Sequence, residues 1–199
     1  MSQTKLILAS GSRVRATLLK NADIPFQIIK TDTDEALIKE QGLKLGHDLE
    51  TIALHLALAK AKAVDAPSDT VVLGADQLME FEGRAFDKPK TISEAKERLL
   101  SFRGKPHSLI NACVLMQNGK MIWHHIERPI LHVRNFTPSE LETYFKQCND
   151  DILNSVGAYQ LEHVGIRLFE KIQGDYFAIL GLAISPLLAA LRELEVIEF

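Results

Sequence analysis

This sequence has few cysteines, no long apolar run and no excess of positive charge, and each of these features excludes a class of protein. Two cysteines, Cys113 and Cys148, occur among 199 residues, and they lie far apart with no C-x-x-C pair. They provide no disulfide framework, which is typical of a protein from a reducing compartment. We expect both thiols to be buried as small hydrophobic groups.

The charge balance and the length of the apolar segments exclude two kinds of partner. The formal net charge of −3 gives no general attraction to DNA or to an anionic membrane. No segment approaches the length of a membrane-spanning helix, and the apolar run Leu6–Ala9 is too short for the core of a signal peptide. We therefore expect a cytoplasmic protein with no nucleic-acid or membrane partner.

The sequence also lacks internal repeats, low-complexity tracts and linkers rich in Pro, Gly or Ser. Its content of 46% hydrophobic and 25% charged residues is ordinary for a globular protein with a hydrophobic core. At this length, a single domain over residues 1–199 is the simplest expectation.

Strands and helices alternate along the chain, and their order predicts an α/β fold with a mixed sheet. Residues 77–86 and 108–133 should form hairpins, because Glu82-Gly83 and Asn118-Gly119 are typical turn pairs. The other expected strands are residues 5–9, 26–29 and 70–73, the last ending at Gly74-Ala75-Asp76. The expected helices are residues 13–21, 49–64, 93–102 with Ser93 as N-cap, 138–146 after Thr137, and 185–195 with Pro186 in the first turn.

The first candidate site is the segment Ser10-Gly11-Ser12-Arg13-Val14-Arg15, at the junction of an expected strand and an expected helix. Backbone N–H groups, hydroxyls and guanidinium groups can converge on a phosphate at such a junction. A helix cap beside two solvated arginines is an equally open interpretation of the same residues.

The next two candidates are carboxylates. Asp76 follows an apolar strand and Gly74, where its carboxylate can hold a divalent cation or take a proton from water, although turn-forming aspartates occupy similar places. Asp32, Asp34 and Glu35 offer the hard oxygen ligands that Mg²⁺ or Mn²⁺ prefers, although a solvated loop has the same composition.

Three lysines could complete such a site. Lys60 on the helix 49–64 and Lys88, just before Pro89, could neutralise phosphate oxygens as negative charge shifts during phosphoryl transfer. We expect Lys62 on the same helix to be solvated.

Taken in order along residues 6–191, these fragments resemble the Maf family of proteins. The matching motifs are Leu8-Ala9-Ser10-Gly11-Ser12-x-x-Arg15, Asp34-Glu35, Leu56-Ala57-x-x-Lys60-Ala61, Gly74-Ala75-Asp76, Lys88-Pro89, Gly104-x-x-His107, Gly157-Ala158-Tyr159 and Gly174-Asp175-Tyr176 with Gly181-Leu182. Each motif is weak alone, but the ordered series is specific.

The resemblance implies a fold, a reaction and a set of site residues. Proteins of this kind hydrolyse nucleoside triphosphates between the α and β phosphates, and so act on acid anhydrides, with a divalent metal ion such as Mg²⁺ or Mn²⁺. Their elongated mixed β-sheet is flanked by helices, with two lobes around a central cleft, as in the inosine-triphosphate pyrophosphatases. The implied catalytic residues are Asp76, Lys60 and Lys88, and the implied metal ligands are Glu35 and Asp76. The implied substrate-binding residues are Ser10, Ser12, Arg13, Val14, Arg15, Gln77, Gly157 and Glu162.

Departures from the common pattern affect the expected choice of base. Val14 replaces the first of two family arginines, Arg13 stands at a proline position, Gln77 follows the aspartate where Thr is usual, and Glu162 replaces a glutamine. These residues are closer to the branch that acts on 7-methyl-GTP than to the branch that acts on dTTP and UTP. A carboxylate such as Glu162 can accept hydrogen bonds from a guanine edge and favours a cationic methylated ring. The family lysine before the Gly157 motif is Ser155 here, which removes one expected cationic contact.

An alternative function is a nucleotide-binding regulatory protein linked to septum formation, whose altered base-facing residues have reduced its turnover. The intact set of carboxylates and lysines favours the enzyme, because binding alone does not require a carboxylate beside the phosphate that is cleaved. The sequence leaves open whether the protein forms a homodimer and whether Asp76 acts mainly as a base or as a metal ligand.

Overall fold

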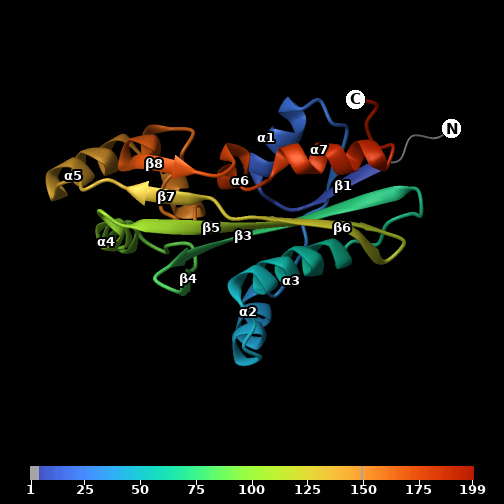
Figure 1. The fold of residues 1–199 in the computed structure, drawn as a ribbon, viewed down its shortest axis with the longest axis horizontal. Coiled ribbons are helices and arrows are strands. Elements are labelled where there is room, and N and C mark those ends of the chain that lie inside the picture. The colour runs from blue at the N-terminus through green and yellow to red at the C-terminus, as the bar shows by residue number, and fades with distance from the viewer. Residues whose placement is uncertain (1–4, 149) are drawn as a thin grey trace. The chain divides into compact units, whose positions relative to one another are not determined.

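The computed structural model describes residues 5–148 and 150–199 of the chain (Figure 1). It confirms an α/β fold with a mixed sheet, whose strand order is β2-β1-β3-β5-β7-β8, with β4 paired to β3 and β6 paired to β5. The pairs of β1 with β2 and β3 are parallel, and the pairs that involve β4, β6, β7 and β8 are antiparallel. Among the described residues, no helix is long and apolar enough to cross a membrane.

The strands are β1 (Lys5–Ala9), β2 (Gln27–Ile28), β3 (Thr70–Phe81), β4 (Arg84–Phe86), β5 (Pro106–Gln117), β6 (Lys120–Glu127), β7 (Ile130–Val133) and β8 (Phe169–Gln173). The α-helices are α1 (Arg13–Asn21), α2 (Glu35–Lys44), α3 (Leu49–Lys62), α4 (Ile92–Phe102), α5 (Pro138–Gln147), α6 (Tyr176–Leu180) and α7 (Ile184–Glu193). Two short 3-10 helices, η1 (Asp150–Asn154) and η2 (Val164–Leu168), precede β8.

Contacts within the chain group the residues into two compact units. The first unit contains Met1–Gln77, Asn111–Glu127 and Phe177–Phe199, and the second contains Leu78–Ile110 and Arg128–Tyr176. The long strands β3 and β5 contribute residues to both units.

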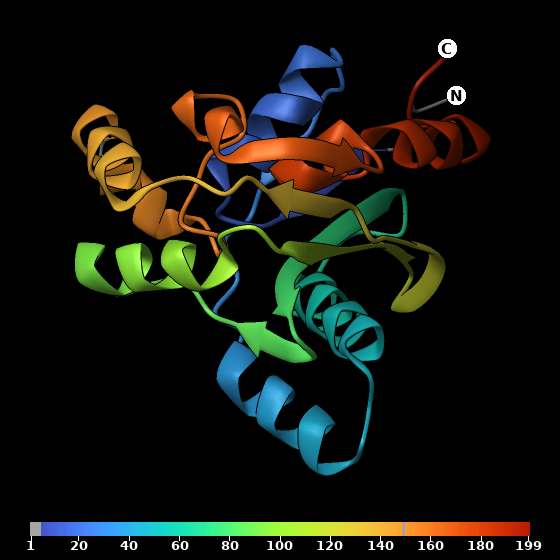
Figure 2. The ribbon, with the colours of Figure 1, turned by 60° about the vertical axis from the view of Figure 1, so that its left-hand side comes forward.

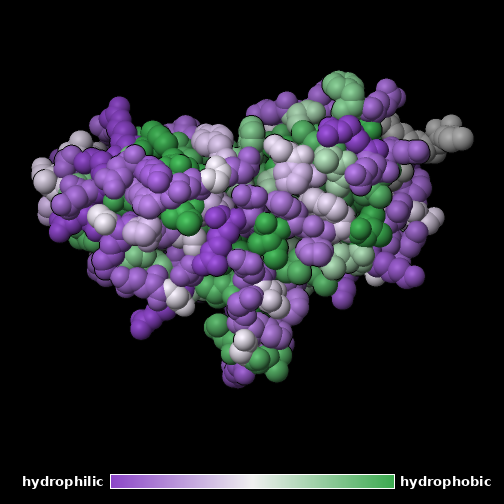
Figure 3. Space-filling view, viewed as in Figure 1, coloured by the Kyte–Doolittle hydropathy of each residue, from purple (hydrophilic) through white to green (hydrophobic). Residues whose placement is uncertain are grey.

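In the first unit, helices cover both faces of the sheet. Alternate residues such as Leu6 and Leu8 of β1, and Leu73 of β3, join α1 and α7 in one hydrophobic core. The opposite face of the strands carries α3, and Figure 1 shows α1 and α7 on one side of β1 and β3 with α3 on the other. The helix α2 packs against α3, and Leu37 and Leu43 of α2 and the following Leu45 are exposed. Figure 3 shows hydrophobic surface, in green, on this part of the first unit.

Close approach of α3 to β3 depends on Gly74. A Cβ atom at Gly74 would lie 2.1 Å from the carbonyl oxygen of Ala57 and 2.9 Å from the Cβ of Ala61, both on α3. Real Cβ atoms do not approach a backbone atom so closely, so any larger residue would push α3 away from the sheet. Gly74 therefore sets how closely the buried face of α3, including Lys60, lies to the strand.

The second unit is built around an aromatic cluster. Phe81, Phe102, His107, Tyr159 and Phe169 form ring contacts with centroid distances of 4.7 to 5.9 Å. Figure 2 shows β7 (olive) beside β8 (orange), the antiparallel pair of this unit.

Several expected elements are confirmed. Both hairpin turns form, with left-handed backbone at Glu82-Gly83, where φ is 51° and 77°, and at Asn118-Gly119, where φ is 51° and 72°. The Thr137 N-cap is also present and forms a full capping box with Glu140.

Two expected element boundaries were wrong, and one alternative that the sequence left open is resolved. The strand that begins at Thr70 does not end at Asp76 but continues to Phe81, so Asp76 lies inside β3. The N-cap of α4 is Thr91, whose hydroxyl accepts from the N–H of Glu94, rather than Ser93. The acidic run is not only a loop, because Asp34 caps α2 and Glu35 is its first residue.

A substitution at Gly74 tests the close packing of α3. We expect Gly74→Ala to lower the free energy of unfolding by about 3 kcal/mol or more, because the added methyl overlaps backbone atoms of α3. Gly11→Ala is a matched control, since its Cβ would meet the side chain of Lys30 at an ordinary 3.4 Å. Denaturant unfolding measures both variants, and equal stabilities would contradict the packing argument.

Candidate functional site

The pleat of β3 places Asp76 on the face that α3 covers. Side chains alternate along a strand, so Asp76 shares a face with Gly74, while Ala75 and Gln77 point to the face that carries α1 and α7. Asp76 is only 5% exposed. A carboxylate buried to this degree requires a charged or hydrogen-bonding partner.

Lys60 supplies that partner. The residue belongs to the buried face of α3, between Ala57 and Ala61, which flank Gly74. Its ammonium group donates to the carboxylate of Asp76 and pairs with Glu35 at 2.8 Å. The three charges therefore converge on one point, and their sum is one negative charge.

Glu35 reaches this point from the first turn of α2. Asp34 caps the helix by accepting from the N–H of Leu37 at 3.0 Å, which places the side chain of Glu35 beside Lys60. The Glu35 side chain is 45% exposed, whereas that of Asp76 is 7% exposed. One carboxylate of the cluster is thus accessible to solvent and the other is nearly dry.

This donor set is suited to a metal ion that arrives with a phosphate ligand. Among residues 5–148 and 150–199, no three His, Cys, Asp or Glu side chains form a group that could hold an ion by themselves. Mg²⁺ is commonly bound through one or two carboxylates, with substrate phosphates and water as the other ligands. Asp76 and Glu35, which meet at one ammonium group, fit that pattern.

The turn after β1 lies beside Asp76, because β1 and β3 are neighbouring parallel strands. Ala9 pairs with Gly74, so Ser10 lies beside the part of β3 that continues to Asp76. The buried hydroxyl of Ser10 accepts from the N–H of Ser12 at 3.2 Å, and the Ser12 hydroxyl caps α1. The first N–H groups of α1, which an α-helix leaves without an intrahelical acceptor, therefore belong to this turn.

Arg15 ties the turn to the strand and to the C-terminal part of the chain. Its Nε donates to the carbonyl of Gly181 at 2.8 Å, and its Nη1 donates to the carbonyl of Ala75 at 2.8 Å and to Ser10 Oγ at 3.1 Å. Burial lowers the pKa of the Arg15 guanidinium, and the negative charges of Asp76 and Glu35 oppose that shift. Arg15 is thus a buried cation that organises the turn.

Gln77 is on the other face of β3 from Asp76. Its Nε2 donates to the carbonyl of Ile179 at 3.1 Å, and a Cβ at Gly181 would lie 3.1 Å from its Oε1. Gln77 therefore neighbours the loop that Arg15 holds. In the same region Val14 is half-buried and Arg13 is exposed.

The sequence analysis missed Lys30. Its side-chain carbons would contact a Cβ at Gly11 at 3.4 Å, so this exposed lysine lies over the turn that contains Ser10 and Ser12. Lys30 follows β2, which is parallel to β1, and the carboxyl ends of parallel strands meet at one edge of a sheet. That rule, applied to the two predicted strands, could have identified it.

The remaining predicted residues belong to the second unit. Lys88 is exposed and follows β4, and Glu162 is exposed in the turn before η2. Gly157 is buried, and a Cβ there would lie 2.2 Å from the ring of Tyr159, so the motif Gly157-Ala158-Tyr159 requires glycine at its first place.

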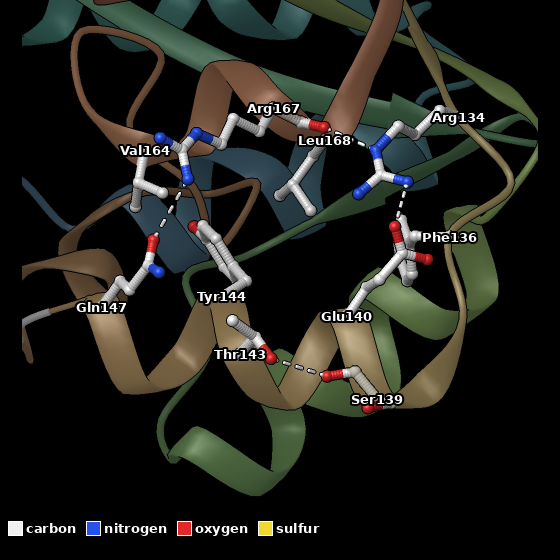
Figure 4. Close-up of a pocket in the computed structure, with 10 residues that line it drawn as sticks. All are labelled: Arg134, Phe136, Ser139, Glu140, Thr143, Tyr144, Gln147, Val164, Arg167 and Leu168. Carbon is white, nitrogen blue, oxygen red and sulfur yellow. Dashed lines mark hydrogen bonds and ion pairs between the residues drawn. The ribbon is translucent and has the colours of Figure 1, made fainter.

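The second unit also contains a small pocket of about 190 Å³, shown in Figure 4. Arg134 and Arg167 line it, but Glu140 pairs with Arg134 at 2.8 Å, and Gln147 accepts from Arg167 at 3.5 Å. None of the residues predicted from the sequence to bind substrate or metal lines this pocket.

Comparison with known proteins agrees with the motifs. The family described as Maf-like protein matches residues 5–194. A nucleoside triphosphate pyrophosphatase from Maricaulis maris is 43% identical over 196 residues, which are 98% of this chain and 99% of that protein. Two 7-methyl-GTP pyrophosphatases are similar to the same degree: that of Rhizobium etli is 42% identical over 195 residues, 98% of each chain, and that of Bartonella henselae is 44% identical over 194 residues, 97% of each chain. The chain belongs to the family of Maf-like proteins.

Proposed function

We propose that this protein hydrolyses nucleoside triphosphates between the α and β phosphates, releasing a nucleoside monophosphate and pyrophosphate. The observation that carries the proposal is the convergence of Asp76, Lys60 and Glu35 beside the turn Ser10–Arg15. Relatives similar along the full chain are named nucleoside triphosphate pyrophosphatase and 7-methyl-GTP pyrophosphatase, which supports the same reaction here.

Phosphate binding is assigned to the turn and its cations. The Ser10 and Ser12 hydroxyls and the first N–H groups of α1 donate hydrogen bonds to the triphosphate, and the exposed side chains of Arg13 and Lys30 add positive charge nearby. Since Nε and Nη1 of Arg15 are used by the protein, Arg15 acts through its charge and its Nη2. Lys88 and Gly157, both in the second unit, are further proposed substrate-binding residues.

We further propose that Asp76 and Glu35 hold Mg²⁺ or Mn²⁺ together with the substrate. When bound, the ion neutralises phosphate oxygens and polarises the anhydride. Lys60 keeps the two carboxylates together and stabilises charge that develops on the phosphates. Asp76, the less exposed carboxylate, orients the attacking water and takes its proton.

The second candidate function, a regulatory nucleotide-binding protein linked to septum formation, is less well supported. Binding of a nucleotide needs donors and cations, and it does not need two carboxylates next to phosphate groups, where they repel the ligand unless a metal is present. The cluster of Asp76 with Glu35 therefore favours turnover. The cytoplasmic location and the homodimer stay predictions.

The base preference rests on chemistry rather than on names, since relatives with both names are similar to this chain at 42 to 44% identity. Glu162 is exposed, so its carboxylate is accessible to a ligand. A carboxylate can bind the N1–H and N2–H donors of guanine as a pair, whereas thymine and uracil present N3–H between two carbonyls that an anion repels. We therefore propose a preference for guanine-type triphosphates, with 7-methyl-GTP foremost.

Substitution of Asp76 tests the proposed reaction. Asp76→Asn removes the negative charge and the basicity but keeps the size of the side chain, so pyrophosphate release should fall at least about a hundredfold. Asp65→Asn, at an exposed position of the loop between α3 and β3, is the matched control and should retain normal turnover. Near-normal release by the folded Asp76 variant would refute the assignment.

Metal dependence has a direct test. EDTA should abolish pyrophosphate release, and Mg²⁺ or Mn²⁺ should restore it, because hard carboxylate oxygens from Asp76 and Glu35 suit these ions. Full activity after exhaustive chelation would show that the reaction does not use a metal.

A panel of canonical and modified nucleoside triphosphates measures the base preference. Two charge-assisted hydrogen bonds to Glu162 are expected to contribute about 2 to 4 kcal/mol, so kcat/KM for 7-methyl-GTP should exceed that for dTTP or UTP by roughly thirtyfold or more. Glu162→Gln should narrow the gap by weakening the guanine substrates. A higher kcat/KM for dTTP or UTP would overturn the base preference but not the reaction.

A further inference from the structure

Two segments of the second unit that carry proposed substrate-binding residues meet at one buried arginine. Arg98, on α4, donates through Nη1 to the carbonyl of Asp87 and, at 2.6 Å, to the carbonyl of Val156. Asp87 immediately precedes Lys88, and Val156 immediately precedes Gly157. One nitrogen of Arg98 thus joins the backbones of both segments.

The surroundings fix the orientation of this guanidinium. Its Nη2 pairs with Glu94 at 3.0 Å, one turn earlier on α4, and its Cζ lies 5.3 Å from the centre of the Phe86 ring. The Arg98 side chain is 6% exposed, against 43% for that of Glu94. Burial lowers the pKa of Arg98, and the charge of Glu94 opposes that shift.

A buried cation at this place requires an explanation other than stability. Burying a guanidinium costs hydration energy that one half-exposed glutamate does not fully offset, and an apolar residue of similar volume would fill the same space. What such a residue could not do is donate to two carbonyls at once. The planar, multidentate guanidinium provides that connection, and the single ammonium of a lysine provides it poorly.

The segment after Val156 is itself held in an unusual conformation. Ala158 has φ of 58°, which non-glycine residues rarely adopt, and Tyr144 donates to its carbonyl at 3.2 Å. The hydroxyl of Tyr159 lies 2.7 Å from Nε2 of His107, and burial lowers the pKa of His107 to about 3, so this ring is neutral. These contacts fix the Gly157 segment, and Arg98 connects it to the segment of Lys88.

We propose that Arg98 is a positioning residue, which holds the backbone of Asp87 beside that of Val156 and so places Lys88 and Gly157 for the same triphosphate. The proposal rests on the proposed pyrophosphatase function. Catalytic groups displaced by about 1 Å lose on the order of a hundredfold in rate, so loss of this connection affects turnover although Arg98 itself is remote from the substrate.

The test compares Arg98→Met with Arg134→Met. Arg134 is a matched control, because it also joins segments of the second unit, through the Arg167 carbonyl at 2.6 Å and Glu140 at 2.8 Å, but touches neither the Lys88 nor the Gly157 segment. We expect kcat/KM for pyrophosphate release to fall at least about tenfold in Arg98→Met and less than about threefold in the control. If Arg98→Met fails to fold, Arg98→Lys keeps the charge and should show an intermediate loss.

A double-mutant cycle separates positioning from a general loss of structure. If Arg98 acts partly through Lys88, Arg98→Met should lower kcat/KM by a smaller factor in a Lys88→Met background than in the wild type, because only its effect on the Gly157 segment remains. Loss factors that simply multiply, or an Arg98 variant as active as the control, would overturn the proposal.

Hydrogen exchange tests the connection without relying on activity. The amides of Asp87, Lys88 and Lys90 and of residues 155–158 should exchange faster in the Arg98 variant than in the wild type, and their exchange should not change in Arg134→Met. Unchanged exchange in both segments would refute the role of Arg98. A wild-type protein that releases no pyrophosphate would instead refute the proposed function, while the exchange data would still decide whether Arg98 holds the two segments.

Discussion

The pairing of Lys60 with Asp76 is the interaction on which the rest of the candidate site depends. A carboxylate that is only 5% exposed is costly to bury without a cation, and the cation comes from a helix that must lie directly on the strand. Gly74 permits that approach because it has no side chain, and the two-residue repeat of the strand puts Asp76 on the same face. Glu35 then joins the pair from α2. A glycine, a lysine and the strand pleat together determine where the carboxylates converge.

The same pairing explains why the neighbourhood needs additional positive charge. Lys60, Asp76 and Glu35 together carry one negative charge, which would repel a triphosphate. The buried charge of Arg15, the first turn of α1 and the nearby Lys30 oppose that repulsion within the same unit. In the proposed reaction, a divalent cation held by Asp76 and Glu35 would offset the remaining repulsion between the carboxylates and the phosphates. The arrangement therefore favours a nucleotide that binds together with its metal ion.

How much the sequence could predict follows from the range of each interaction. The strand β1, the cap of α1 and both hairpins depend on neighbours a few positions apart, and their local patterns were sufficient to predict them. The end of β3 was misplaced because Gly74 was interpreted as the start of a turn, whereas it serves the packing of a helix from earlier in the chain. Gln77 lies on the face opposite Asp76 because β3 continues beyond Asp76, and the approach of Lys30 to Gly11 depends on the parallel pairing of β1 with β2 rather than on the sequence around either residue.

The carboxylate cluster proposed for catalysis and the glutamate proposed to contact the base belong to different units of the chain. Asp76, Lys60 and Glu35 are in the first unit, and Glu162 is in the second. The two units hold their proposed site residues by separate contacts. The carboxylates are held by α3, whereas the segments around Lys88 and Gly157 are held by Arg98 and the aromatic cluster. A substitution such as that at Glu162 changes an exposed group without disturbing the packing that holds the carboxylates. In the proposed function, this separation lets related proteins with one reaction differ in the base that they accept.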